Sequence, residues 1–241
     1  MPAQMKLANT APQFHHRRMK FVRIVQILLV TQFMLGGVAA RACEVALLLS
    51  IDVSGSIDRG EYRLQTSGLA DALDDPEVRD ALLLGQVALS VVQWSGTGKQ
   101  TLSLPWRRML SENEVARFAT QARALERAYF GSDTAVGEAI AFSAEQFAAV
   151  SDCRRKVIDI SGDGPQNAGF PLAPERAAAE SAGVEINAIA IEDLGHAISI
   201  TEFYRRSVVT RNGFVVTARG LADYPRAIRA KILREVAKPL G

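Results

Sequence analysis

Largely apolar runs of strand length alternate along the chain with stretches that have the period of an amphipathic helix. The apolar runs end at polar or glycine residues, as expected of strands covered on both faces. Between them, apolar residues recur every three to four positions, which is typical of helices with one buried face. We predict strands at 44–51, 84–94, 99–104, 156–161, 184–191 and 213–217. We predict helices at 59–73, 111–129, 135–150, 174–182, 199–208 and 221–236.

This alternation predicts an α/β fold. Crossovers long enough to hold a helix connect parallel strands, so we expect a three-layer, doubly wound, mostly parallel sheet of Rossmann-like type. Residues 99–104 follow a Gly-Thr-Gly turn and are expected to form one antiparallel edge strand. Such sheets bind ligands beyond the carboxyl ends of their strands, so the polar residues at those ends are the candidates for function.

Composition narrows the functional classes. The 241 residues are 48% hydrophobic and 22% charged, as in an ordinary globular protein, and two cysteines are too few for a four-thiolate zinc site. The net charge of +2 is unevenly placed: residues 1–42 hold six basic and no acidic residues, which leaves 22 basic against 26 acidic residues in 43–241. The main part of the chain therefore has no excess positive charge for binding nucleic acid.

The first 42 residues have the pattern of a secretory signal peptide. Lys20 and Arg23 precede an apolar run at 24–35, and small residues follow up to a predicted cleavage point before Cys43, with Arg41 as an alternative first residue. Met19 is an alternative to Met1 as the first translated residue. We therefore predict a signal peptide at 1–42 and one domain at 43–241.

Export follows from this prediction. The apolar run is short for a membrane span and contains two glutamines, so we expect a periplasmic or secreted protein without a membrane span after cleavage. A lipoprotein acylated at Cys43, or a signal-anchored form, is less favoured, because Ala40 stands where lipid-attachment sites usually have leucine.

The two cysteines, Cys43 and Cys153, each precede an apolar strand. If those strands are parallel neighbours, both cysteines lie at the same end of the sheet, and an oxidising compartment permits a bridge between them. We expect a disulfide, with two buried free thiols as the alternative.

Hydroxyl and carboxylate side chains gather at the strand ends. The first strand runs into Asp52-Val-Ser54-Gly-Ser56, in which the three oxygen-bearing side chains fall on one side if the segment stays extended. Thr134 precedes a predicted helix, and Asp163 follows the strand expected beside the first one. Hard oxygen ligands of this kind suit Mg²⁺, Mn²⁺ or Ca²⁺ rather than zinc.

This set resembles the metal-ion-dependent adhesion site of von Willebrand factor A-type domains. That site consists of Asp-x-Ser-x-Ser, a threonine in a later loop, and an aspartate after the next core strand. All its positions are filled here, by Asp52, Ser54, Ser56, Thr134 and Asp163. The order of strands and helices extends the resemblance to nearly all of 43–241. Segments 92–95, 131–134 and 158–164 look like a secreted proteobacterial branch of this family that has no assigned function.

The resemblance implies a protein-binding module. In families with this site the hydroxyls bind a divalent cation directly, the aspartates bind it directly or through water, and an open position accepts an acidic residue of a partner protein. Two aspartates offset the 2+ charge, and hydroxyls in place of further carboxylates leave the cation able to attract the partner's carboxylate. We therefore expect Mg²⁺, or Mn²⁺ or Ca²⁺, and a protein partner that offers Asp or Glu.

Other interpretations of the same residues remain open. Asp52 and Ser54 can cap the following helix, with Asp58 as a rival cap; Thr134 can cap the next one, and Asp163 can be a turn residue. A metal-dependent hydrolase needs a general base near the cation, for which Asp133 is the candidate. A scaffold without metal is a third possibility. The chain has no Gly-x-Ser-x-Gly nucleophile motif, and we do not expect an enzyme.

Overall fold

The computed structural model describes residues 43–192 and 199–237. The predicted signal peptide at 1–42 lies outside the described residues. Within them, no helix is both long and apolar enough to cross a membrane.

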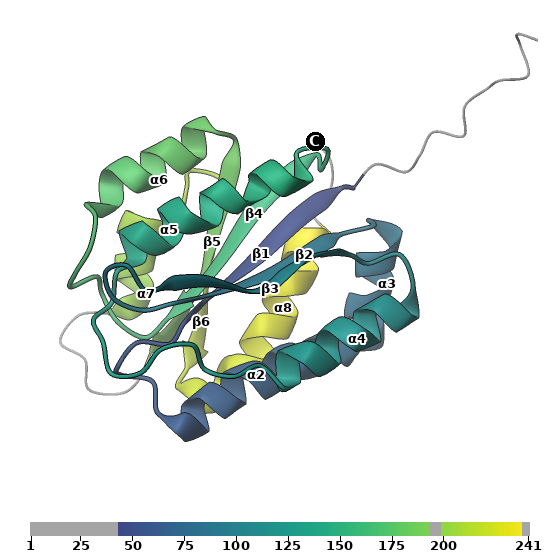
Figure 1. Ribbon diagram of the computed structural model, residues 1–241, viewed down its shortest axis with the longest axis horizontal. Helices are drawn as coiled ribbons and strands as arrows, with labels where there is room; N and C mark the ends of the chain where they lie inside the picture. Colours follow the sequence, from purple (N-terminus) through teal and green to yellow (C-terminus); the bar gives the residue numbers. More distant parts are fainter. Residues whose placement is uncertain (1–42, 193–198, 238–241) are drawn as a thin grey trace, which may run out of the picture. The chain divides into compact units, whose positions relative to one another are not determined.

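A single sheet forms the middle layer of the molecule (Figure 1). Its strands lie in the order β3-β2-β1-β4-β5-β6, and only β3 is antiparallel to its neighbour. The strands are β1 (Val45–Asp52), β2 (Ala88–Trp94), β3 (Gln100–Arg108), β4 (Arg155–Gly162), β5 (Val184–Glu192) and β6 (Val215–Arg219). The predicted fold class, a mostly parallel sheet with one antiparallel edge strand, is confirmed.

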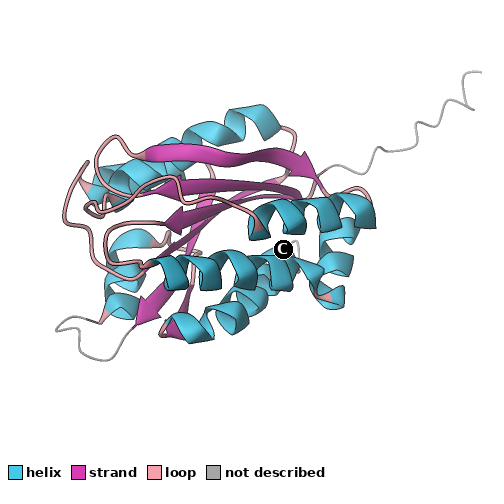
Figure 2. Ribbon diagram, turned by 60° about the horizontal axis from the view of Figure 1, so that its bottom comes forward, coloured by secondary structure: helices cyan, strands magenta, loops and turns pink. Residues whose placement is uncertain are grey.

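Helices cover both faces of the sheet (Figure 2). One face packs against α2 (Arg59–Asp74), α3 (Pro76–Leu84), α4 (Glu112–Arg123) and α8 (Tyr224–Val236). The other packs against α5 (Val136–Glu145), α6 (Leu172–Ser181) and α7 (Ile200–Phe203), with a 3-10 turn at Gln146–Val150 and a π-helical turn at Tyr204–Val208. A short 3-10 turn at Leu221–Asp223 leads into α8. Successive residues of β1 alternate between the two apolar cores, Leu47 and Leu49 facing α8, and Leu48 facing α5.

The strands that follow β1 in the chain lie on both sides of it in the sheet. From β1 it proceeds outward through β2 to β3, and it then crosses back to β4 on the other side of β1. The loops after β1 and β4 consequently diverge to opposite faces, and their strands pair from Val45 with Arg155 to Ile51 with Ser161. The carboxyl ends of β1 and β4 therefore flank the switch point at which open α/β sheets bind ligands.

Two predicted elements differ in the structure. Leu84 is predicted as the first residue of a strand and 76–83 as neither strand nor helix, but 76–84 form helix α3. The Asp75 side chain caps this helix by accepting from Glu77 N and Val78 N at 3.0 and 3.2 Å. The helix predicted at 111–129 ends at Arg123. Beyond it the main chain bonds to the side chain of Gln93, which accepts from Ala128 N at 3.0 Å and donates to the oxygen of residue 126 at 2.9 Å.

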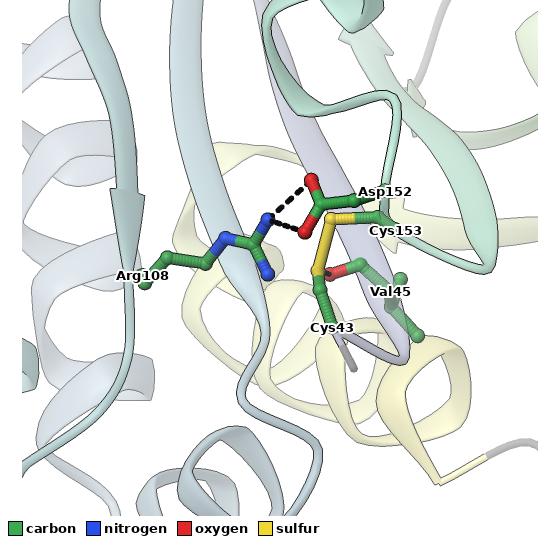
Figure 3. The surroundings of a disulfide bond; sticks show 5 residues. All are labelled: Cys43, Val45, Arg108, Asp152 and Cys153. Atoms are coloured by element: carbon green, nitrogen blue, oxygen red, sulfur yellow. Dashed lines mark hydrogen bonds and ion pairs between the residues drawn. A yellow bond between two sulfur atoms is a disulfide. The ribbon is translucent and has the colours of Figure 1, made fainter. Parts of the chain in front are cut away.

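A disulfide joins Cys43 to Cys153 at the amino ends of β1 and β4 (Figure 3). The two strands are the parallel neighbours that this pairing requires. Arg154 N also donates to Cys43 O at 2.9 Å, so the main chains are already in register beside the bridge. Next to it, Asp152 pairs with Arg108 of β3 at 2.6 Å (Figure 3).

Candidate metal centre

The five predicted ligands converge at the carboxyl end of the sheet. Asp52 is the last residue of β1, and Ser54 and Ser56 lie in the loop that follows. Asp163 comes directly after β4, and Thr134 lies two residues before α5. Although they come from three separate loops, their side chains are joined by a continuous set of short contacts.

Ser54 is the centre of these contacts. Its Oγ lies 3.4 Å from Thr134 Oγ1 and 3.3 Å from Ser56 Oγ, and Ser56 Oγ donates to Asp163 Oδ1 at 2.8 Å. Ser54 N donates to Asp52 Oδ1 at 2.7 Å. The arrangement presents two carboxylates and three hydroxyls to one small region, which is a donor set for a hard divalent cation.

Asp52 has one carboxylate oxygen without a partner. The side chain is fully buried, and Oδ2 forms no hydrogen bond with any described residue. Burial raises the pKa of Asp52 to about 7, and the nearby carboxylate of Asp163 adds to this effect. A buried carboxylate of this kind is costly unless something satisfies it, and a cation bound here would do so while lowering the pKa again.

The cluster lacks the thiolate and imidazole ligands that are typical of zinc sites. Among residues 43–192 and 199–237, no three His, Cys, Asp or Glu side chains are grouped closely enough to hold a metal. The hydroxyls of Ser54, Ser56 and Thr134 must therefore contribute if a cation binds, and hydroxyl oxygens are ligands of Mg²⁺ and Mn²⁺ rather than of a thiolate- or imidazole-bound metal.

The competing helix-cap interpretations are wrong for three of these residues. Helix α2 is capped by Asp58, whose side chain accepts from Glu61 N at 2.8 Å, so neither Asp52 nor Ser54 serves as its cap. The N-cap position of α5 is Ala135, without a side-chain cap, so Thr134 does not cap that helix. These hydroxyl and carboxylate groups are left facing the cluster.

Arg127 holds the loop after β1 in place. One of its guanidinium nitrogens donates to Val53 O at 2.9 Å and to Ser54 O at 2.7 Å, and the guanidinium lies over the ring of Phe130. Its positive charge also opposes the rise in the pKa of Asp52. Sequence analysis missed this residue because 127 fell within a predicted helix that ends earlier.

Asn167 holds the loop that carries Thr134. Its Oδ1 accepts from Thr134 N at 2.8 Å, and its own N–H donates to Thr134 O at 3.0 Å. A second link joins Gly55 N to Ser132 O at 2.8 Å. In the sequence, the one indication that residue 167 could bind the main chain of a loop is that it is an asparagine among turn residues.

Asp133 lies apart from the contacts within the cluster. It is solvent-exposed, and only its main-chain oxygen contacts the site loops, by accepting from Ser95 Oγ at 3.4 Å. No hydrogen bond among the described residues joins its carboxylate to the five predicted ligands. The structure therefore gives no support for the general base that the hydrolase interpretation requires.

Solved structures with a similar fold are von Willebrand factor A domains. Proximal thread matrix protein 1 from the mussel byssus, in a structure with a zinc-occupied MIDAS motif, aligns with a TM-score of 0.60 and 18% identity over 81% of this chain and 48% of its own. A von Willebrand factor type A protein from Catenulispora acidiphila gives 0.61 and 19%, over 82% and 44%. The corresponding domain of the pilus tip protein Mfa5 from Porphyromonas gingivalis gives 0.60 and 11%, over 83% and 98%.

These likenesses establish the fold. The chain spans about half the length of the mussel protein and of the Catenulispora protein. A search of curated proteins finds no match. A family model described as "Protein of unknown function (DUF1194)" matches residues 42–240. The chain therefore belongs to the DUF1194 family, whose fold is that of the von Willebrand factor A domain.

Proposed function

We propose that this protein is an exported, metal-dependent protein-binding module. Asp52, Ser54, Ser56, Thr134 and Asp163 would hold Mg²⁺ or Mn²⁺, with Ca²⁺ as the alternative, and the cation would supply an electrophilic position for a carboxylate of a partner protein. The observation that carries the proposal is the cluster of three hydroxyls and a carboxylate in mutual contact, next to the buried carboxylate of Asp52, whose Oδ2 has no partner among the described residues.

The charge of the cluster favours this role. Two carboxylates offset a divalent cation without excess negative charge, so an incoming carboxylate is not repelled. The exposed position of Ser56 and the partial exposure of Asp163 leave the outer side of the cluster open to a partner. The solved structures of similar fold, a byssus matrix protein and pilus proteins, are in keeping with adhesion rather than catalysis.

The metal site is tested by calorimetry on the purified protein after treatment with a chelator. Wild type is expected to bind Mg²⁺ or Mn²⁺ saturably, and Asp52→Asn is expected to lose this binding. Asp133→Ala removes a neighbouring exposed carboxylate and serves as the matched control, with unchanged affinity.

In the presence of chelator, Asp52→Asn should also unfold at a higher temperature than wild type, because it removes a buried carboxylate with an unpartnered oxygen. Absence of binding by folded wild type would support the scaffold without metal instead.

The carboxylate-binding step has a separate test. Mn²⁺ bound to the protein relaxes the protons of coordinated water, and acetate added to the sample is expected to displace that water and reduce the relaxation. Acetamide has nearly the same shape without the charge and should have no effect. Equal responses to acetate and acetamide would contradict carboxylate recognition.

We further propose that the protein is not an enzyme and acts in the periplasm or outside the cell. Asp133, the general base that a hydrolase would need, is exposed and has no hydrogen bond to the five candidate ligands among the described residues. We therefore expect no turnover on phosphate or peptide model substrates, and turnover lost in Asp133→Ala would overturn this. The disulfide and the signal-like pattern of residues 1–42 support export. Amino-terminal sequencing of the protein recovered from the periplasm or medium tests the predicted cleavage before Cys43.

A further inference from the structure

A buried hydroxyl without a partner lies directly behind the candidate metal centre. Tyr204 is fully buried, and its hydroxyl forms no hydrogen bond with any described residue. The same is true of Asp52 Oδ2. Leaving a buried polar atom unsatisfied destabilises the folded state, so two such atoms in one place need an explanation.

Gly162 shows that these two oxygens border the same small space. A Cβ built on Gly162, the last residue of β4, would overlap the Tyr204 hydroxyl and lie 3.0 Å from Asp52 Oδ2. No hydrogen bond joins the two oxygens directly. The absence of a side chain at Gly162 therefore gives the Tyr204 hydroxyl room beside Asp52 Oδ2. One water molecule in contact with both oxygens would satisfy both of them.

The backbone that carries Tyr204 is unusual. Residues 204–208 form a π-helical turn directly after α7, and the ring packs edge-on against Phe203 with centroids 5.4 Å apart. Single π-helical turns often occur at functional sites. Burial raises the pKa of Tyr204, and the carboxylates of Asp52 and Asp163 add to the effect, so the hydroxyl keeps its proton and is a hydrogen-bond donor at neutral pH.

We propose that Tyr204 is a positioning residue of the metal centre, which holds the carboxylate of Asp52 through one water molecule seated against Gly162. The hydroxyl donates to this water, and the water donates to Asp52 Oδ2. A carboxylate oxygen has two lone pairs, so Asp52 Oδ2 would accept from this water and still be able to bind the cation, and the water would fix the orientation of the carboxylate. This inference rests on the proposed function, because it assigns a role within the same site. Partners of this kind around metal ligands typically change metal affinity 10- to 100-fold.

The test compares the metal affinity and the stability of Tyr204→Phe with those of wild type. Phenylalanine fills the same volume without the hydroxyl. We expect the affinity for Mn²⁺, measured by calorimetry, to fall about tenfold or more. We also expect the melting temperature of Tyr204→Phe in chelator to equal or exceed that of wild type, since the unpartnered hydroxyl is removed. The rise in melting temperature on adding Mn²⁺ should be smaller for the variant than for wild type. Tyr224→Phe alters a buried tyrosine on the opposite face of the sheet and is the matched control, with unchanged affinity.

A second variant tests the position of the Tyr204 hydroxyl beside Gly162. Gly162→Ala places a methyl group against this hydroxyl, so Mn²⁺ affinity should fall and the protein should become less stable. Combining it with Tyr204→Phe should relieve the overlap and recover stability, while affinity stays low. If wild type and Tyr204→Phe bind Mn²⁺ equally, the role of Tyr204 is refuted and the metal site stands. If wild type binds no cation, the proposed function fails, and this inference fails with it.

Discussion

Gly137, in the first turn of α5, lies against the main chain of the loop that follows β4. A Cβ at this position would lie 2.5 Å from the carbonyl oxygen of Phe170. The Gly137 N–H also donates to Gln166 Oε1 at 2.8 Å. Two independent contacts therefore bind the start of α5, just after Thr134, to the loop that begins with Asp163.

We predict that Gly137→Ala destabilises the protein by about 1–3 kcal/mol, through overpacking against a rigid main chain. The expected sign is opposite to that of helix propensity, which favours alanine over glycine by about 1 kcal/mol. Urea denaturation measures the effect. Gly164→Ala is the control, since no atom lies within 4 Å of its Cβ position, and it should change stability by less than about 0.5 kcal/mol. A more stable Gly137→Ala variant would contradict the prediction and show that the loop around Phe170 moves to accommodate the methyl group.

At the scale of elements, the amino ends of β1 and β4 are linked covalently. The disulfide between Cys43 and Cys153 spans 110 residues of sequence. These two strands carry Asp52 and Asp163 at their opposite ends, so the bridge and the candidate metal centre lie at the two ends of the same strand pair.

We predict that the double substitution Cys43→Ser/Cys153→Ser lowers the free energy of unfolding by about 2–5 kcal/mol, because the unfolded chain regains the freedom of a long loop. Denaturation with and without a reducing agent provides the measurement. Reductant should destabilise wild type and leave the double variant unchanged. Equal stability of wild type under oxidising and reducing conditions would mean that the bridge contributes nothing.

At the scale of the whole molecule, the two faces of the sheet bury different polar groups. The face covered by α5 buries Tyr204 next to the candidate metal centre, and the face covered by α8 buries a cluster of ion pairs. In that cluster Lys231 Nζ lies 2.5 Å from Asp159 Oδ1 and 2.6 Å from Glu235 Oε1, with all three side chains buried. Asn187 Nδ2 donates to Glu235 Oε1 at 2.9 Å. One lysine thus faces two carboxyl groups, and α8 is joined to the strand that leads to Asp163.

The cluster makes stability depend on pH. Burial, with the neighbouring carboxyl of Asp159 as the second cause, raises the pKa of Glu235 to about 8, and burial raises that of Asp159. The folded state thus holds a proton that the unfolded state, with an ordinary glutamate pKa of 4.5, has lost. This contribution to stability is fully present below about pH 4.5 and is lost as the pH rises through about 8.

We therefore predict that the free energy of unfolding falls between pH 5 and 8, with a limiting slope of about 1.4 kcal/mol per pH unit for one proton. Glu235→Gln removes one titrating group and should make the fall less steep, while the buried carboxyls of Asp52 and Asp159, whose pKa values are also raised, keep part of it. Urea denaturation at several pH values, with chelator present throughout, gives the difference between the variant and wild type. Parallel curves for the two proteins would contradict the assignment to Glu235.

Sequence patterns predicted the sheet and the five candidate ligands because their signals are local. The apolar runs at β1, β4 and β5 identify strands covered on both faces, and the spacing of Asp52, Ser54 and Ser56 places three oxygen-bearing residues in one loop. Strand ends meet at one edge of a parallel sheet, so Asp163 was found from its position after a strand, whereas Thr134 was found from the resemblance to the adhesion site. The strand predicted to begin at 84 begins at Ala88 instead, because Pro76 follows the capping Asp75 and starts helix α3, which extends to Leu84.

The amino-acid sequence by itself thus determined the alternation of elements and the fold class, and it identified the candidate oxygen ligands, since the signals for most of these lie a few positions apart. The tertiary structure alone decided which distant groups complete the centre. Arg127 reaches the loop after β1 because Gln93 binds the main chain beyond α4, and Tyr204 lies behind Asp52 because Gly162 leaves room for its hydroxyl. Such contacts join residues far apart in the chain, and no local pattern encodes them.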